Sequence, residues 1–107
     1  MNNHPRTTFK FTLPIGLPDE SGEKHKQGVM RRATGMDMFA LYKNSQSWDN
    51  PSYGVLVILA RTMIQLGTLT NITAEFLEQL FLRDLHYLLD FHNAIALEEA
   101  QLSLSGE

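Results

Sequence analysis

The chain has 107 residues, of which 43% are hydrophobic and 20% charged, as is typical of one soluble globular domain. It contains no cysteine, which excludes disulfides and thiolate metal sites and is compatible with a reducing compartment. The net charge of −3 is unevenly divided: residues 1–43 hold seven basic and four acidic residues, and residues 44–107 hold two and eight. Such opposed halves can orient copies or partners on encounter, although two solvated faces of one monomer explain them equally well.

The start of the chain and its apolar runs indicate a cytoplasmic protein without a membrane span. The first ten residues, MNNHPRTTFK, are polar and lack the apolar run of a signal peptide. The longest apolar run, Val55 to Ala60, is far shorter than the roughly 20 residues of a membrane helix. We expect residues 1–107 to form a single domain, with residues 1–6 as a flexible arm and residues 98–107 as a frayed tail.

Residues 7–33 are expected to form a β-hairpin. In TFKFTLP, the apolar residues Phe9, Phe11 and Leu13 alternate with polar ones, which is the period of a half-buried strand. Pro14 is expected to end this strand or to hold it at a sheet edge, and a long mobile loop should follow. The segment VMRRA is expected to return as the second strand. Because two strands alone are marginally stable, the hairpin should lie on helices or on another subunit.

Three α-helices, two of them long and antiparallel, are expected over residues 34–97, which makes the fold class α+β. Thr34 with Asp37 three residues later is an acidic variant of the capping box, so a short first helix is expected over residues 35–43. The next segment, NSQSWDN, has the composition of a loop. We interpret Trp48 within it as a packing anchor, with ligand stacking as the alternative.

The two longer helices are expected after this loop. Asn50 followed by Pro51 is typical of a helix start, and the apolar middle of this second helix indicates burial on nearly every side. We expect it to run to Leu66. Thr73 is expected to cap the third helix, over residues 74–97.

The stretch RDLHYLLDFHN in the third helix raises the possibility of a metal or acid–base site. Most of its polar residues fall, together with Gln79, in one stripe of alternating charge, which is typical of an exposed helix face. His86 and Asp90 could supply two metal ligands, but His92 projects roughly 120° away around the helix, and a site needs three. Because no nucleophile or phosphate-binding loop accompanies them, we predict no enzyme activity, no metal and no cofactor. The stripe consists of Gln79, Arg83, His86, Asp90 and Asn93.

Asp84 and His92 fall on the apolar side of the same helix. An unpaired polar group in such a place is unfavourable by several kcal/mol. Asp84 is therefore expected to accept hydrogen bonds, either from Arg61 on the second helix or from N–H groups at a helix start, and so to fix the register of the helix. A carboxylate that binds a partner is the alternative.

The apolar sector of the third helix is wider than one small core requires. Each large apolar side chain left in water forgoes about 1.5–3 kcal/mol. The surplus predicts either self-association, as a dimer or larger oligomer, or the binding of a client protein. The expected partner-binding residues are Leu82, Tyr87, Leu89 and Phe91, with Arg83, His86 and Asp90 at their rim.

Three stretches together resemble small tail-assembly proteins from the gene clusters of contractile phage tails and phage-tail-like contractile injection systems. They are FKFTLPIGLPDESGEKHKQGVMRRAT, NPSYGVLVILARTMIQLGTL and ITAEFLEQLFLRDLHYLLDFHNAI, and the resemblance covers about Phe9 to Ile95. More loosely, the hairpin followed by helices is similar to the broader group of tail assembly chaperones. The resemblance implies no catalytic residues. It implies a chaperone that coats the helical tape-measure protein and helps to recruit tail tube subunits.

Two other functions compete with the chaperone. A permanent baseplate or tube-end component of the same particle would have the same fold. A nucleic-acid-binding regulator is suggested by basic residues near the hairpin, but the acidic balance of the chain argues against it, so neither nucleic acid nor membrane is expected as a partner. The basic residues concerned are Lys24, Lys26, Arg31 and Arg32.

Overall fold

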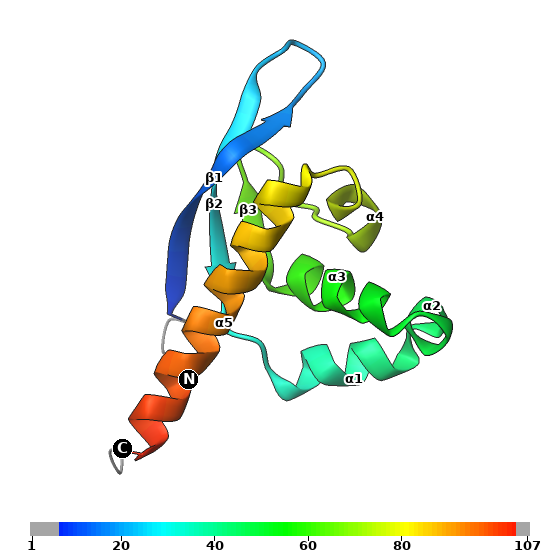
Figure 1. Ribbon diagram of the computed structural model, residues 1–107, viewed down its shortest axis with the longest axis vertical. Coiled ribbons are helices and arrows are strands. Elements are labelled where there is room, and N and C mark those ends of the chain that lie inside the picture. Colours follow the sequence, from blue (N-terminus) through cyan, green and yellow to red (C-terminus); the bar gives the residue numbers. More distant parts are fainter. Residues whose placement is uncertain (1–6, 105–107) are drawn as a thin grey trace.

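A computed structural model describes residues 7–104 and shows an α+β fold, in agreement with the sequence (Figure 1). Three antiparallel strands form a sheet in the order β1-β2-β3. The expected flexible arm, residues 1–6, and the last three residues of the expected tail lie outside the described residues. The elements in chain order are β1 (Thr8–Pro18), β2 (Lys24–Arg31), α1 (Gly35–Lys43), α2 (Ser45–Asp49), α3 (Pro51–Thr62), β3 (Met63–Leu66), α4 (Ala74–Leu77) and α5 (Leu82–Leu104).

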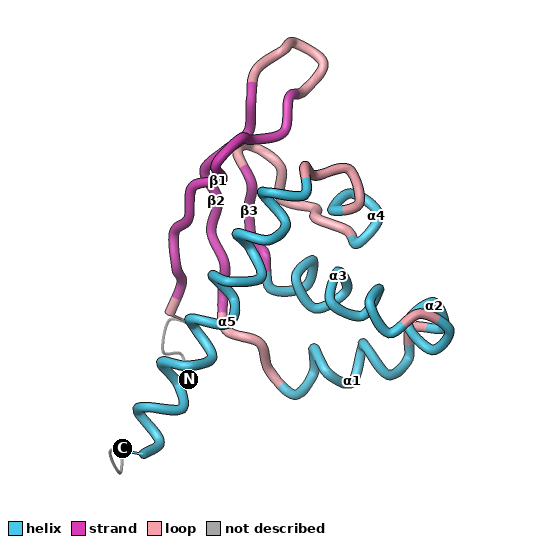
Figure 2. Tube along the Cα trace, viewed as in Figure 1, coloured by secondary structure: helices cyan, strands magenta, loops and turns pink. Residues whose placement is uncertain are grey.

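The hairpin lies within the expected residues 7–33, but its strands are longer and its loop is shorter than expected. β1 continues to Pro18, and β1 and β2 project beyond the rest of the molecule as a two-stranded ribbon (Figure 2). Its turn is closed by Asp19, whose carboxylate accepts the backbone N–H groups of Ser21 at 2.9 Å and Glu23 at 3.0 Å. Pro14 does not end the strand, but β1 does lie at the sheet edge, where a missing N–H is tolerated.

The pairing of β1 with β2 is interrupted by a bulge near the middle of β1. Thr12 pairs with Gln27, but the next pair joins Leu17 to His25, so β1 contains extra residues between the two pairs. Gly16 lies in this bulge with φ of 92°, a conformation that residues with a Cβ rarely adopt. The bulge releases backbone N–H groups from the ladder, so they need other acceptors.

The prediction that the second helix reaches Leu66 is wrong. α3 ends at Thr62, and the next four residues form β3, which pairs with β2. In β3, Met63 and Leu66 are buried, and the two residues between them are exposed. The third strand covers an edge of the hairpin and supplies part of the support that the hairpin was expected to need.

The third expected helix is divided into α4 and α5, so the described residues form five helices rather than three. The cap is confirmed, because Thr73 Oγ1 accepts the N–H of Phe76 at 3.0 Å. Leu77 at the end of α4 and Leu80 in the segment before α5 are both buried. The chain therefore changes direction between the two helices while both leucine side chains stay in the core. The expected pair of long antiparallel helices is not confirmed.

α5 crosses the face of the sheet and contacts β1 (Figure 1). It has 23 residues and continues to Leu104, so residues 98–104 are helical and not a frayed tail. The core lies between the sheet, α3 and α5. Its most buried apolar side chains are Phe11, Leu13, Met30, Leu59, Met63, Leu66, Leu77 and Leu88.

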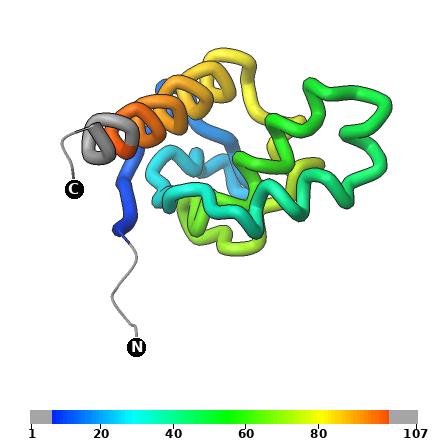
Figure 3. The backbone as a smooth tube through the Cα atoms, turned by 90° about the horizontal axis from the view of Figure 1, so that it is seen from below, coloured from blue at the N-terminus to red at the C-terminus, as the bar shows by residue number. Residues whose placement is uncertain are grey.

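The helices α1, α2 and α3 form a lobe that extends away from the sheet (Figure 3). The start of α1 agrees with the sequence, since the Asp37 carboxylate accepts the backbone N–H of Thr34 at 2.7 Å. α2 is a short helix inside the segment expected to be a loop. A Cβ on Gly54 would lie 2.8 Å from Leu41 Cδ1, so glycine at this position allows α1 to pack closely on α3.

No helix within residues 7–104 combines the length and the apolar character that crossing a lipid bilayer requires.

Candidate functional site: an apolar groove between the lobe and α5

The buried carboxylate of Asp84 binds the bulge of β1. Asp84 is fully buried, and its Oδ1 and Oδ2 accept the backbone N–H groups of Ile15 and Gly16, each at 2.9 Å. The prediction that Asp84 accepts hydrogen bonds is confirmed, but the predicted donors are wrong. Neither Arg61 nor a helix start supplies them. The reason is the bulge, whose freed N–H groups the sequence pattern did not reveal. Asp84 therefore fixes the hairpin on the first turn of α5.

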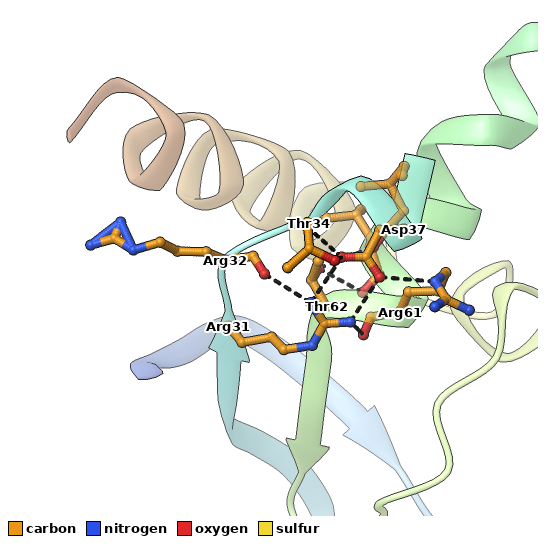
Figure 4. A network of polar contacts seen from close by, with 8 residues as sticks. Arg31, Arg32, Thr34, Asp37, Arg61 and Thr62 are labelled. Carbon is orange, nitrogen blue, oxygen red and sulfur yellow. Dashed lines mark hydrogen bonds and ion pairs between the residues drawn. The ribbon is translucent and has the colours of Figure 1, made fainter. Parts of the chain in front are cut away.

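Arg61 instead belongs to a cluster around Asp37 (Figure 4). The two carboxylate oxygens of Asp37 accept two hydrogen bonds from the guanidinium of Arg31, both at 2.8 Å. Arg61 Nε donates a third at 2.9 Å. Hydrogen bonds from Arg31, opposed by burial and supported by the Thr34 N–H and Arg61, hold the pKa of Asp37 well below its usual range. The charged cluster joins α1 to β2 and α3.

Two of the expected partner-binding residues, Tyr87 and Phe91, pack on the sheet. Both are half-buried, and their rings contact that of Phe11, with centroids 6.4 and 5.6 Å away. The Tyr87 hydroxyl also accepts the backbone N–H of Thr12 at 3.3 Å. These rings therefore attach α5 to β1 and leave only part of their surface for a partner.

The other expected residues separate along α5. Leu82 is 65% exposed at its start, and the rim residues Arg83, His86 and Asp90 are exposed. Leu89 is half-buried and faces α3 across an apolar groove. The structure therefore does not gather the expected set in one place, and Leu89 is the member that lies at the centre of a concave surface.

This apolar groove has a volume of about 460 Å³ and lies between the lobe and α5. α1 and α2 form one wall, α3 the floor and α5 the other wall. Polar atoms are few in its lining, so it offers mainly apolar contact area. Its principal lining residues are Leu41, Tyr42, Trp48, Val55, Ile58 and Leu89.

Large apolar side chains stand exposed at the rim of the groove and on α1. Trp48 is 69% exposed and Tyr42 64%, and the indole Nε1 of Trp48 donates to the Tyr42 carbonyl at 2.7 Å. Met36, Met38 and Phe39 are each more than half exposed. Trp48 is thus not the buried packing anchor that we expected. Exposed apolar side chains around a groove are typical of a protein-binding site.

A second hollow, of about 440 Å³, adjoins the groove along α3 and α5 and shares Val55 and Leu89 with it. His86 lines this hollow together with Tyr53 and Leu85. Within residues 7–104, no group of three or more histidine, aspartate or glutamate side chains is arranged to hold a metal ion. The second hollow extends the apolar surface of the groove, and His86 lies at its polar edge.

His92 lines the groove from the side of α5. The side chain is half-buried, and its Nδ1 atom is buried without a hydrogen-bond partner within the described part of the chain. Burial lowers the pKa of His92, against a smaller opposite effect of Glu99 and Asp37. The neutral imidazole is therefore favoured in the folded protein.

Comparisons with protein-family models, with curated proteins and with solved structures found no match.

The sequence pattern missed the contribution of the lobe. Leu41, Tyr42 and Trp48 were not among the expected partner-binding residues, although they form one wall of the groove. A signal was present, because the short first helix carries apolar residues on more sides than one buried face needs. The argument from the width of the apolar sector, which identified surplus apolar surface on the last helix, applies to the first helix as well.

Proposed function

We propose that the protein is a non-enzymatic assembly factor of a contractile phage tail or phage-tail-like injection system. It would act as a chaperone that binds an amphipathic helix of the tape-measure protein, of a tail tube subunit or of both. The resemblance over Phe9 to Ile95 supports the class of particle. The exposed apolar groove supports the mode of action, and it is the observation that carries the proposal.

The energetic argument rests on the rim of the groove. Trp48 and Tyr42 are each more than 60% exposed, and full burial of one large apolar side chain is favourable by about 1.5–3 kcal/mol. A helix laid in the groove would bury both rings and several side chains on its floor. Helix-in-groove recognition works in this way, with apolar anchors of the bound helix at every third or fourth residue.

Self-association uses the same surplus of apolar surface. We expect the free protein to be a dimer or larger oligomer at micromolar concentration, in which another copy covers exposed apolar side chains outside the groove, such as Met36, Met38 and Phe39 on α1. The mass measured by light scattering decides this. A monomer of 12.2 kDa would count against self-association but not against the binding of a client.

Capture of the tape-measure protein tests the proposal. The two proteins would be produced together and isolated through a tag on the present chain. The double variant Tyr42→Ser/Trp48→Ser should lower capture at least tenfold, because it removes the apolar rim. The matched control is Ile64→Ser/Leu97→Ser, which removes exposed apolar side chains that line neither the groove nor its surroundings along α3, and it should leave capture unchanged.

The content of purified particles separates the chaperone from a permanent component. A chaperone should be abundant in producing cells and depleted from finished particles. A fixed number of copies in every particle would instead identify a baseplate or tube-end component. Failure to capture either the tape-measure protein or the tube subunit would contradict both.

A further inference from the structure

We propose that the apolar groove selects a basic amphipathic helix, in which lysine or arginine residues flank the apolar stripe on both sides. This inference rests on the proposed function and specifies the chemistry of the partner. It goes beyond apolar contact, because the charges around the groove decide which amphipathic helices fit.

Carboxylates border the groove on the side of α5. Asp90 is exposed and lies on the same helix face as His86 and Asn93, which line the second hollow and the groove. Glu99 lies close enough to His92 to oppose the effect of burial on the pKa of that histidine. A helix in the groove would therefore pass beside two negative charges on α5.

Carboxylates also lie on the α3 side of the second hollow, opposite α5. Glu75 and Glu78 lie near Tyr53, where they add to the effect of burial in raising the pKa of its hydroxyl. Asp49, at the end of α2, lines a shallow depression together with Tyr53. The second hollow thus has acidic residues on both flanks, and the adjoining groove has them on the side of α5.

Few positive charges offset these carboxylates. Residues 44–99 contain Arg61 and Arg83 as their basic residues, and Arg61 is bound to Asp37. Lys43 at the end of α1 lies over the ring of Phe39, 4.7 Å from its centroid. The flanks can therefore pair with cations from outside, which favours a basic partner in specificity and in association rate more than in raw affinity.

The shape of the site favours a helix over a small molecule. Tyr42 and Trp48 line the groove and are still 64% and 69% exposed, so covering their outer surface favours an occupant as wide as a helix, about 10 Å across. The groove and the second hollow adjoin through Val55 and Leu89, which provides room for successive anchors along one helix.

The helices of a second copy lack the required pattern. α1, α3 and α5 carry one basic residue each, namely Lys43, Arg61 and Arg83. A second copy would also bring its own acidic flanks to the contact. The occupant that fits is a helix of another protein.

Two synthetic helical peptides of 18 residues test the inference with the full chain. Both carry the same leucine and alanine stripe, and the flanking positions are lysine in one and glutamate in the other. Fluorescence anisotropy should show at least tenfold tighter binding of the lysine peptide at low salt. The difference should shrink as salt screens the charges, since the screening length falls to about 3 Å at 1 M.

Charge-reversal variants locate the effect. Asp90→Lys/Glu99→Lys should lower affinity for the lysine peptide at least tenfold and raise it for the glutamate peptide. The control Glu20→Lys/Glu23→Lys makes the same charge change at the tip of the hairpin and should not alter the preference. Equal effects of both double variants would show attraction to net charge alone and overturn the inference.

The remaining outcomes separate this inference from the proposed function. If both peptides bind equally well and Tyr42→Ser/Trp48→Ser weakens both, the groove binds helices without selecting basic ones, so the inference fails and the proposed function stands. If neither peptide binds and Tyr42→Ser/Trp48→Ser dissociates an oligomer, the groove is occupied by a second copy and the inference fails. Capture of the tape-measure protein then decides the proposed function separately.

Discussion

In the half of the molecule built from the sheet and α5, the buried carboxylate of Asp84 is paired and aromatic rings pack on one another. In the lobe built from α1, α2 and α3, the largest apolar side chains face solvent. Asp84 is fully buried and satisfies two backbone donors, whereas Trp48 is 69% exposed on a helix of five residues. The difference indicates that the first half supplies stability and that the lobe supplies contact surface. Substitutions should therefore have different consequences in the two halves.

The largest loss of stability is expected from Asp84→Leu. It would leave the N–H groups of Ile15 and Gly16 without acceptors inside the structure, at about 1–3 kcal/mol each, so unfolding in urea should show a loss of about 4 kcal/mol. Leu88→Asp, in the same helix, should be similarly damaging because it places a charge in the core. The control Asp90→Leu changes an exposed residue and should alter stability by less than about 0.5 kcal/mol.

The next largest effect is expected from Asp37→Asn, at the joint between the halves. Removal of one partner of a buried ion pair costs about 3–5 kcal/mol, and the exposed position of Arg61 places this case at about 3 kcal/mol or below. Hydrogen exchange should accelerate most in α1, since the cluster holds that helix to the sheet. Uniform acceleration across all helices would show that the lobe and the sheet are not separable units.

The stability of the protein at acid pH should depend on the same cluster around Asp37. The folded pKa of Asp37 is depressed, so its contribution to stability is present above its ordinary pKa of 3.8 and is lost as the pH falls below that value. The wild-type protein should lose stability in this window more steeply than Asp37→Asn. Parallel curves for the two proteins, measured by urea unfolding at several pH values, would exclude this role.

A smaller effect is expected from His92, at a higher pH. Its folded pKa is lowered mainly by burial, so the unfolded chain takes up a proton first as the pH falls below the ordinary value of 6.5. Stability should therefore decrease below pH 6.5 in the wild type. His92→Phe should lack this decrease, and an unchanged slope in the variant would assign it to another group.

The smallest effect is expected from His86→Ala. His86 is exposed at the edge of the second hollow and makes no hydrogen bond among the described contacts, so the change in stability should stay within about 0.5 kcal/mol. Capture of the tape-measure protein should also be nearly intact. A severe loss of either would restore the acid–base or metal interpretation of RDLHYLLDFHN.

The sequence predicted those parts of the fold whose signals are local. The caps at Thr34 and Thr73 and the helix start at Pro51 depend on neighbouring residues alone, and the structure has all three. β3 was missed because MIQL follows an apolar helix without a break in composition. Its strand conformation depends on pairing with β2, which is a contact between distant residues.

The candidate site was only partly accessible for the same reason. The excess of apolar residues was visible in the sequence, as was the need of Asp84 for donors. The donors themselves lie 69 and 68 residues away in a bulge, and the wall of the groove that faces α5 comes from α1 and α2. Local periodicity shows which helices carry more apolar side chains than one core can bury. It does not show which of these side chains contact one another in the folded protein.

The bond between Asp84 and the bulge of β1 also has a consequence for biosynthesis. The strand that needs this carboxylate is made before the helix that supplies it, so the hairpin has no acceptor for Ile15 and Gly16 until 68 further residues have been translated. Contacts of such long separation slow folding and delay it toward the end of synthesis. A nascent chain that has not yet reached α5 therefore lacks one wall of the groove.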